Sequence, residues 1–391
     1  MSNTADTEGP GRRPIAGILL ALFGAFLAVG CVLPVLPRYV RGPLDSGDVA
    51  VAVVVTAAGI SAIVARPVGG RLADARGRRV LFVAGAAFEL AAGLAYLVAD
   101  SVPTMIGARL LLGIGEGLVF TAAAAWIVSQ APADRRGQLV GFAGLSMWSG
   151  LTLGPLAGAA LLELSGYDAV WIFAAVTPVV AAVVGLRLPD PAPRHPQRSQ
   201  LLPRAAVRPG VALALASVGY AALAAFVVLH LDRRGVGHGA LVFTAFGSTY
   251  VLTRLLLGRL PDRLGPHRVA LWSGIGEAAG LCVVAAADSL PIALAGAVLT
   301  GAGFSLLYPS LALMVIMRGD PTRQGAALGA YTSFWDVGLS AAGPLVGLIA
   351  DEAGYQAAFL AAAVCAAGAA MVAAAGSAAR RARAEAVAAR H

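Results

Sequence analysis

The sequence contains no lysine, and charged residues of any kind make up only 13% of its 391 residues. Apolar residues make up 58%, and the mean hydropathy is +0.78. So little charge excludes a soluble globular domain, whose composition is far more polar. All the positive side chains other than histidine are arginines, and the net charge is +8. In so apolar a chain this charge indicates membrane topology rather than nucleic-acid binding.

Cysteine is also scarce. Cys31, Cys282 and Cys365 lie in three separate apolar runs, which provides neither a disulfide framework nor a metal motif. The sequence shows no cluster of nucleophile, metal ligands or cofactor motif, so we expect no enzymatic activity, no metal and no cofactor.

Long apolar runs are what the sequence has instead. A helix needs roughly 18 to 25 apolar residues to cross about 30 Å of hydrocarbon, and twelve such runs are present. We therefore predict an all-α membrane protein with twelve transmembrane helices. The runs lie near residues 14–36, 48–68, 80–99, 103–127, 137–162, 168–188, 209–231, 238–257, 269–287, 291–317, 326–350 and 355–376.

Arginine positions set the expected orientation. With both termini in the cytoplasm, all arginines face that side except Arg38, Arg41, Arg233 and Arg234, which lie outside, and Arg109, which lies near or within a helix. Arg12 and Arg13 followed by an apolar run resemble a signal peptide, but we expect the run to remain as the first helix. The predicted parts are a cytoplasmic tail (1–13), a six-helix bundle (14–188), a proline- and arginine-rich linker (189–208), a second six-helix bundle (209–376) and a basic cytoplasmic tail (377–391).

The chain repeats itself at an interval of 188 residues. Residues 66–79 (RPVGGRLADARGRR) return in weaker form at 254–268 (RLLLGRLPDRLGPHR), so that Asp74 corresponds to Asp262. The same interval relates Glu89 to Glu277 and the pair Gly166-Tyr167 to Gly354-Tyr355. In an apolar chain this self-similarity predicts two pseudo-symmetric membrane halves.

The loop from Gly70 to Arg79 resembles the signature of the major facilitator superfamily, and the helix count, central linker and repeat agree with that family. The resemblance implies that this loop holds the other half in the outward-open state. It assigns this latch to Gly70, Asp74, Gly77, Arg78 and Asp262. The physical basis would be a tight glycine turn, with Asp74 accepting hydrogen bonds at a helix N-terminus.

The fifth predicted helix carries a glycine ladder. Gly141, Gly150, Gly154, Pro155 and Gly158 are similar to the antiporter motif of the twelve-helix drug/proton exporters, although Ala159 stands where that motif has a second glycine. Small residues allow close helix packing in lipid, and a central proline provides a bend. A generic small-residue interface is the alternative interpretation.

Ionisable residues inside a membrane are costly and are therefore candidates for function. Glu116 lies in the middle of the fourth predicted helix, on the same face as Arg109 seven residues earlier. We rank Glu116 first as a proton carrier, Asp336 second, and keep Arg109 as a relay candidate. For Glu89 and Glu277 we expect a hydrogen bond that holds a peripheral helix to its bundle.

The resemblance and these residues together predict a proton-coupled exporter of a small lipophilic compound, in a bacterial-type inner membrane. A proton gradient would drive it, no cofactor would be needed, and a monomer is expected. Phe26 and Tyr308 are the candidate substrate-cavity residues because of their depth in cavity-lining helices.

Three alternatives remain. Transport of a hydrophilic metabolite such as a sugar predicts a polar cavity, for which the sequence offers few side chains. A membrane receptor or scaffold predicts long extramembrane segments, and a membrane-embedded enzyme predicts a clustered active site; the sequence shows neither.

Overall fold

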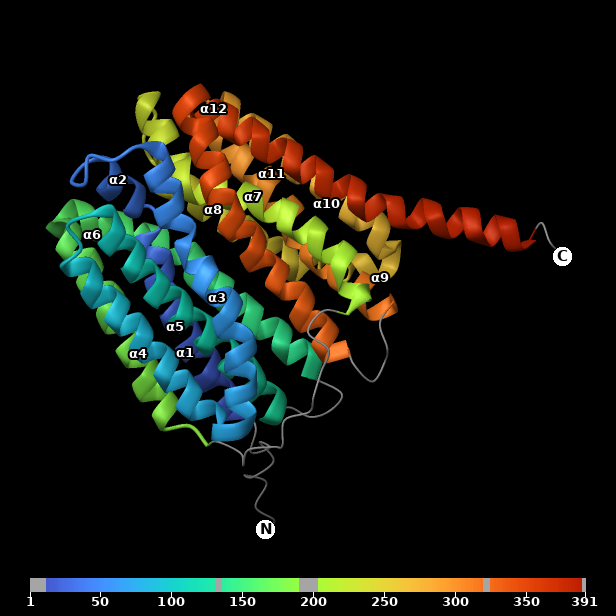
Figure 1. The fold of residues 1–391 in the computed structure, drawn as a ribbon, viewed down its shortest axis with the longest axis horizontal. Helices are drawn as coiled ribbons and strands as arrows, with labels where there is room; N and C mark the ends of the chain where they lie inside the picture. The colour runs from blue at the N-terminus through green and yellow to red at the C-terminus, as the bar shows by residue number, and fades with distance from the viewer. Residues whose placement is uncertain (1–11, 131–135, 190–202, 319–323, 389–391) are drawn as a thin grey trace, which may run out of the picture. The chain divides into compact units, whose positions relative to one another are not determined.

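The computed structural model describes residues 12–130, 136–189, 203–318 and 324–388. All regular structure in these ranges is helical, which confirms the all-α prediction. Figure 1 labels the helices in chain order: α1 (Arg12–Val32), α2 (Leu36–Arg41), α3 (Asp48–Arg76), α4 (Arg78–Leu97), α5 (Val102–Gln130), α6 (Arg136–Leu186), α7 (Arg204–Arg233), α8 (Gly239–Leu257), α9 (Leu260–Leu264), α10 (Pro266–Ala286), α11 (Leu290–Arg318) and α12 (Gln324–Ala388).

Ten of the described helices are long and apolar enough to cross a membrane, rather than the twelve separate helices expected. The difference arises because two predicted pairs of spans each run on as one helix. The apolar stretches Gly141–Leu186 and Ala330–Ala375 are 46 residues long. At 1.5 Å per residue, such a stretch measures about 69 Å, more than twice the thickness of the hydrocarbon.

A glycine interrupts each of these two long helices. Gly166 in α6 has φ 77° and ψ −169°, and Gly354 in α12 has φ 82° and ψ 170°, so each long helix consists of two helices joined at a kink. This backbone conformation is essentially restricted to glycine. The two glycines are repeat equivalents, and so are Gly77 (φ 97°) and Gly265 (φ 87°), which precede α4 and α10. The repeat in the sequence is therefore also a repeat in backbone geometry.

The chain divides into two compact units. Unit 1 contains residues 1–32 and 61–197, and unit 2 contains residues 33–60 and 198–391. In unit 1, α1 packs against α6, and α4 packs against α5 and α6. In unit 2, α7 packs along α12, α10 packs against α11 and α12, and α11 packs against α8. Helix α3 begins in unit 2 and ends in unit 1.

Residues 33–60 belong to unit 2 because they pack closely on α12. A β-carbon added to Gly59 would lie 2.7 Å from Ser340 Oγ, and one added to Gly347 would lie 2.8 Å from Val49 Cα. Such approach distances leave room only for glycine, which allows the backbones of α3 and α12 to meet.

Candidate functional site

A polar cluster lies between α4 and α5 in unit 1. Arg109 is 3% exposed and Glu116 is half-buried, and their seven-residue spacing places them on one face of α5. From α4, Glu89 is close enough to interact electrostatically with Glu116. The hydroxyl of Tyr96, also on α4, interacts electrostatically with both Arg109 and Glu116. The structure therefore adds Glu89 and Tyr96 to the two residues that the sequence indicated.

The expected bracing role of Glu89 and Glu277 is not what the structure shows. Both side chains are 1% exposed, and none of their four carboxyl oxygens has a hydrogen-bond partner within the described part of the chain. The expected hydrogen bonds to a neighbouring helix are thus not formed. Both acids lie instead where two helix backbones cross at a glycine, Gly115 for Glu89 and Gly303 for Glu277.

Asp336 lies in unit 2, on α12, and is 1% exposed. Its main-chain oxygen accepts a hydrogen bond of 2.7 Å from the hydroxyl of Ser340. Gly59 of α3 faces the same turn, since a β-carbon there would be 3.2 Å from the Asp336 oxygen. Beside Asp336, Trp335 belongs to an aromatic cluster in which its ring lies 5.2 Å from that of Tyr220 and 5.3 Å from that of Phe304.

The loop between α3 and α4 has the expected glycine turn at Gly77. Gly70 lies half-buried in α3, with the methyl group of Thr121 3.9 Å from where its β-carbon would be. Arg78 is 4% exposed, and Arg79 Nη1 donates a hydrogen bond of 3.3 Å to the main-chain oxygen of Leu186. The side chain of Asp74 is outside the described part of the structure.

The second copy of this loop differs in its backbone. The corresponding segment is broken at Gly258, and the short helix α9 follows, with Asp262 exposed in its first turn. Pro261 lies in the first turn of this new helix, where its missing backbone N–H costs no hydrogen bond. In the first copy, by contrast, α3 runs unbroken to Arg76.

The glycine ladder of α6 packs against α1 within unit 1. A β-carbon on Gly150 would lie 2.6 Å from Phe23 O, one on Gly154 would lie 2.5 Å from Gly30 C, and one on Gly158 would clash with Cys31 O. Gly141 has nothing within 4 Å of its β-carbon position. Three of the four motif glycines thus allow the backbone of α6 to contact the backbone of α1 directly. The helix continues through Pro155, and its non-helical residue is Gly166.

The two candidate substrate residues are both packed against other rings. Phe26 is 3% exposed and meets Phe120 edge to face at 6.3 Å, and the Arg66 guanidinium lies 5.5 Å from the centre of the Phe120 ring. Tyr308 is half-buried, with its ring 5.4 Å from that of Tyr331. The hydroxyl of Tyr331 donates a hydrogen bond of 2.9 Å to the main-chain oxygen of Tyr308.

Sequence reasoning missed an ionic cluster in unit 2, centred on Asp48. This aspartate, 1% exposed at the start of α3, is 2.9 Å from Arg41 Nη2 and 3.8 Å from Arg233 Nη2. The Tyr355 hydroxyl donates a hydrogen bond of 2.9 Å to Asp48, and the Arg233 guanidinium lies 4.2 Å from the centre of the Tyr355 ring. We call Arg41, Asp48, Arg233 and Tyr355 the Asp48 cluster.

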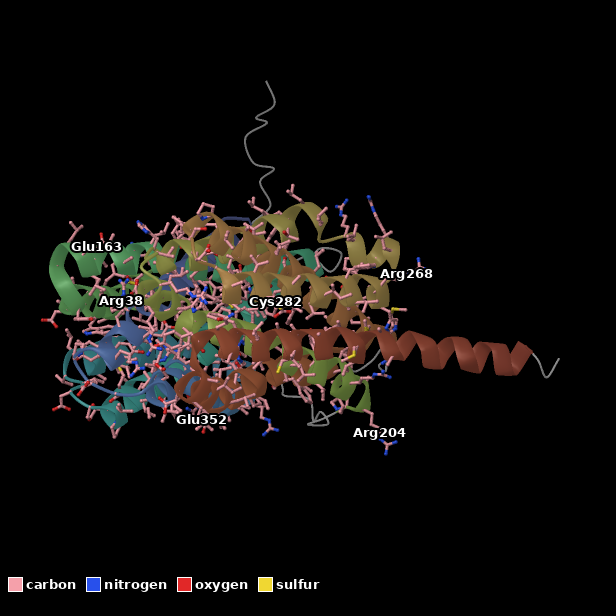
Figure 2. The ribbon with its side chains drawn as sticks, turned by 90° about the horizontal axis from the view of Figure 1, so that it is seen from above. Arg38, Glu163, Arg204, Arg268, Cys282 and Glu352 are labelled. Carbon is pink, nitrogen blue, oxygen red and sulfur yellow. The ribbon has the colours of Figure 1, made fainter. Side chains whose placement is uncertain are left out.

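A second ion pair lies at the same end of unit 2. Arg38 holds Asp232 with two guanidinium nitrogens at 2.8 to 3.0 Å, although both side chains are about one-third exposed. Figure 2 shows Arg38 toward one end of unit 2 and Arg204 and Arg268 toward the other. The signal in the sequence was the placement of Asp48 and Asp232 beside the few arginines that the topology assigned outside.

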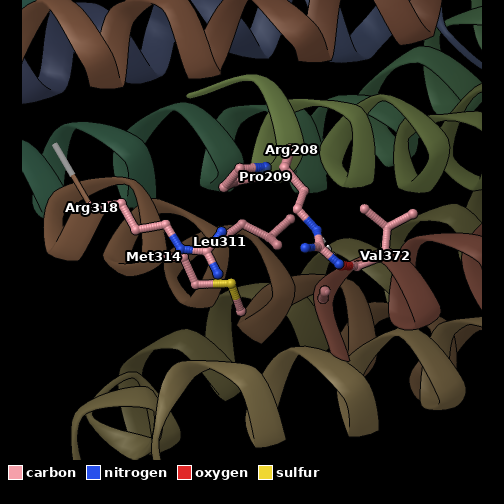
Figure 3. A pocket seen from close by; sticks show the side chains of 7 residues that line it. Arg208, Pro209, Leu311, Met314, Arg318 and Val372 are labelled. Carbon is pink, nitrogen blue, oxygen red and sulfur yellow. Dashed lines mark hydrogen bonds between the residues drawn. The ribbon is translucent and has the colours of Figure 1, made fainter. Parts of the chain in front are cut away.

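Two pockets lie in unit 2, and the first has no room for a substrate. The pocket in Figure 3 is lined by Arg208, Arg318 and apolar neighbours, and it is too narrow for a water molecule. Arg208 Nε there donates a hydrogen bond of 3.1 Å to the main-chain oxygen of Val372. The second, of about 300 Å³, lies beside the start of α10 at Gly265–Arg268.

Comparison with known proteins identifies the family. A sequence profile of the Major Facilitator Superfamily matches residues 18–241 and again residues 210–390. The chain belongs to this superfamily of transporters, which are not enzymes. It is therefore a multi-pass membrane protein.

Relatives of similar length occur in bacteria. An MFS-type transporter of Salmonella typhimurium is 34% identical over 359 residues, covering 89% of this chain and 92% of its own. One of Pseudomonas aeruginosa is 32% identical over 379 residues, covering 90% of both chains.

Solved structures share the fold at low sequence identity. A single-residue mutant of the nucleoside transporter NupG has a TM-score of 0.78 at 13% identity, covering 92% of this chain and 98% of its own. An auto-inhibited POT family peptide transporter has a TM-score of 0.76 at 16% identity, covering 94% and 97%. The human organic anion transporter MFSD10 has a TM-score of 0.72 at 18% identity, covering 93% and 99%.

Proposed function

We propose that this chain is a proton-coupled exporter that moves a small lipophilic compound out of the cytoplasm by alternating access. The observation that carries the proposal is the polar cluster of α4 and α5, where Glu116, Glu89 and Arg109 lie together inside apolar helices. Charged groups at such depth are costly to bury, and in transporters they form proton relays. Glu116 is the proton carrier in this scheme, and Arg109 is its electrostatic partner.

The proposed topology has twelve membrane crossings in two six-helix bundles, residues 14–188 and 209–376, joined by the linker 189–208. The kinks at Gly166 and Gly354 support it, because each divides a helix of twice the spanning length into two crossings. Both termini are cytoplasmic in this topology, which places Arg204 and Arg268 inside and Arg38 outside. Figure 2 is consistent with this, since these arginines lie toward opposite ends of unit 2. The bacterial relatives favour the inner membrane.

The lipophilic class of substrate follows from the scarcity of polar side chains in the spans and from the aromatic cluster around Trp335. Stacking on aromatic rings favours flat apolar ligands. Phe26 and Tyr308 remain cavity candidates under this proposal. The loop 70–79, with Asp74, is the proposed latch of the outward-open state.

Two measurements test the function. The first is growth of an efflux-deficient bacterial host on a panel of lipophilic and hydrophilic toxic compounds, with and without this chain. Export predicts tolerance to particular lipophilic compounds. The second is proton release from reconstituted proteoliposomes when a compound from the panel is added. Protection without proton release would refute the coupling, and uptake of a hydrophilic metabolite would refute both direction and substrate class.

A further inference from the structure

Helix pairs α4/α5 and α10/α11 cross at equivalent points. A β-carbon on Gly115 would lie 2.8 Å from Gly85 O and 2.6 Å from Glu89 Cγ. One on Gly303, the repeat equivalent of Gly115, would lie 2.5 Å from Ser273 O and 2.5 Å from Glu277 N. The two crossings therefore share one register, and each has a buried glutamate beside it.

The surroundings of the two glutamates differ sharply. Glu89 interacts electrostatically with Glu116, and Glu116 in turn interacts with Tyr96, which also interacts with Arg109. At the equivalent positions the second half has Val284, Ala297 and Phe304, all at most 2% exposed. No charged side chain in the described part of the chain acts on Glu277. Glu277 is thus an acid buried among apolar groups.

A glycine makes room for this acid. Glu277 Oε1 would lie 2.8 Å from a β-carbon on Gly219, so the carboxyl group reaches across to α7 at a point where a side chain is missing. Neither of its oxygens has a hydrogen-bond partner among the described residues. The side chain is therefore directed into the contact between α10 and α7 without forming the hydrogen bonds that a structural brace would form.

The other polar groups facing this region are few. On α7, Tyr220 follows Gly219, and about three turns later the His230 ring contacts the main-chain oxygen of Val284 at 3.1 Å. On α11, the hydroxyl of Thr300 already donates to the main-chain oxygen of Gly296 at 2.8 Å. Helix α12 contributes the partly buried thiol of Cys365, and α9 contributes only exposed charges at the far end of α10.

An ionised carboxylate without partners in such a place costs several kcal/mol. A bound proton removes that cost and is the smallest possible counter-charge. We propose that Glu277 is a second proton-binding site, in the second half of the transporter and separate from the site at Glu116. This inference rests on the proposed proton coupling and extends it, because it gives each half of the duplicated chain its own acid. Movement of α7 relative to α10 would open this site to water.

Infrared difference spectroscopy of the purified full chain tests proton binding directly, without any substrate. A protonated carboxylic acid has a carbonyl stretch distinct from that of a carboxylate. On titration to high pH, the wild type should show loss of a carboxylic-acid band that is missing from Glu277→Gln. An identical band in both proteins would overturn the proposal, whatever the protein transports.

Transport by the same variant tests the role. In proteoliposomes, substrate accumulation driven by an imposed pH gradient should fall about tenfold or more in Glu277→Gln, while exchange of substrate without a gradient stays within about twofold. Glu277→Leu should show the same loss of gradient-driven accumulation and the same retained exchange. Its thermal melt should confirm that it is folded. Gradient-driven accumulation at the wild-type level in Glu277→Gln would refute the inference alone. If the pH gradient drove no substrate accumulation in the wild type, the proposed proton coupling itself would be refuted.

Discussion

The Tyr355 hydroxyl donates a hydrogen bond of 2.9 Å to Asp48, so the residue after the kink of α12 is bonded to the first residue of α3. The two residues are 307 positions apart, and both lie in unit 2. Their contact explains why residues 33–60 pack with the second half of the chain. Under the proposed topology this contact lies at the outer end of the protein, and we expect it to hold that end closed.

Asp48→Asn should weaken this closure, because it removes the charge that holds Arg41 and Arg233 while keeping the size of the side chain. Loss of one partner of a buried ion pair costs about 3 kcal/mol, which raises the population of the open state by at least tenfold. The measurement is the rate of thiol labelling of Val49→Cys in a background with the three native cysteines replaced by alanine. Val49 is suitable because it is half-buried and its Cα would lie 2.8 Å from a β-carbon on Gly347 of α12, so labelling requires this contact to open.

The control for this experiment is Asp45→Asn. Asp45 is exposed in the same loop with φ 43°, a conformation that asparagine also adopts readily. Its labelling rate should equal that of the parent. Equal rates in the Asp45 and Asp48 variants would show that the cluster does not hold the end closed.

Gly354→Ala should destabilise the protein. With φ 82° and ψ 170°, this position is in a backbone region that costs a non-glycine residue about 1 to 3 kcal/mol, and the change would also displace the neighbouring Tyr355. Gly107→Ala is the matched control, because Gly107 is helical and has nothing within 4 Å of its β-carbon position. Thermal unfolding in detergent should show a lower midpoint for the first variant and an unchanged or higher one for the second.

Two glycines of the same motif should respond differently to alanine. Gly158→Ala places a methyl group against the main-chain oxygen of Cys31, and overpacking of this kind costs about 1 to 3 kcal/mol. Gly141→Ala meets open space and should be tolerated. We expect reduced thermal stability and transport only in the first. If Gly141→Ala abolished transport without loss of stability, the motif would have a role beyond the packing of α1 on α6.

Glu116→Gln should abolish proton release on addition of substrate while substrate binding persists, because glutamine keeps the shape of the protonated acid and cannot release a proton. The measurement is the pH change of a weakly buffered protein solution after substrate is added. Glu163→Gln, in an exposed position on α6, should release protons as the wild type does. Wild-type proton release from the Glu116 variant would move the carrier role to another acid, with Glu89 the nearest candidate.

Much of the fold could be predicted from the sequence because lipid imposes simple rules. A helix must be apolar over a fixed length, and this located every long helix that the structure describes. The sequence predicted boundaries between spans at residues 163–167 and 351–354, beside Glu163 and Asp351, and the structure has a kink at Gly166 and at Gly354 within these intervals. Hydropathy does not show whether the chain forms a loop at such a boundary or continues as one kinked helix, so the structure has ten long helices where the sequence predicted twelve separate ones.

The candidate site was predictable only in part. The seven-residue spacing of Arg109 and Glu116 fixed their common face, since this follows from helix geometry. The approach of Glu89 to Glu116 depends on how α4 crosses α5, and that crossing is decided by backbone contact at Gly85 and Gly115. The periodicity of apolar residues in one helix does not predict where that helix contacts another, so this crossing could not be predicted from the sequence.

The sequence by itself determined that this protein resides in a membrane, that it is a duplication, and that Glu89 recurs as Glu277, because hydropathy and repetition are properties of the linear chain. Only the tertiary structure decided what surrounds each acid. It placed Glu89 beside Glu116, Glu277 among apolar groups, and Asp48 beside two arginines and a tyrosine. These differences arise because the cost of a charge depends on its neighbours in space, and helix packing brings those neighbours from distant parts of the chain.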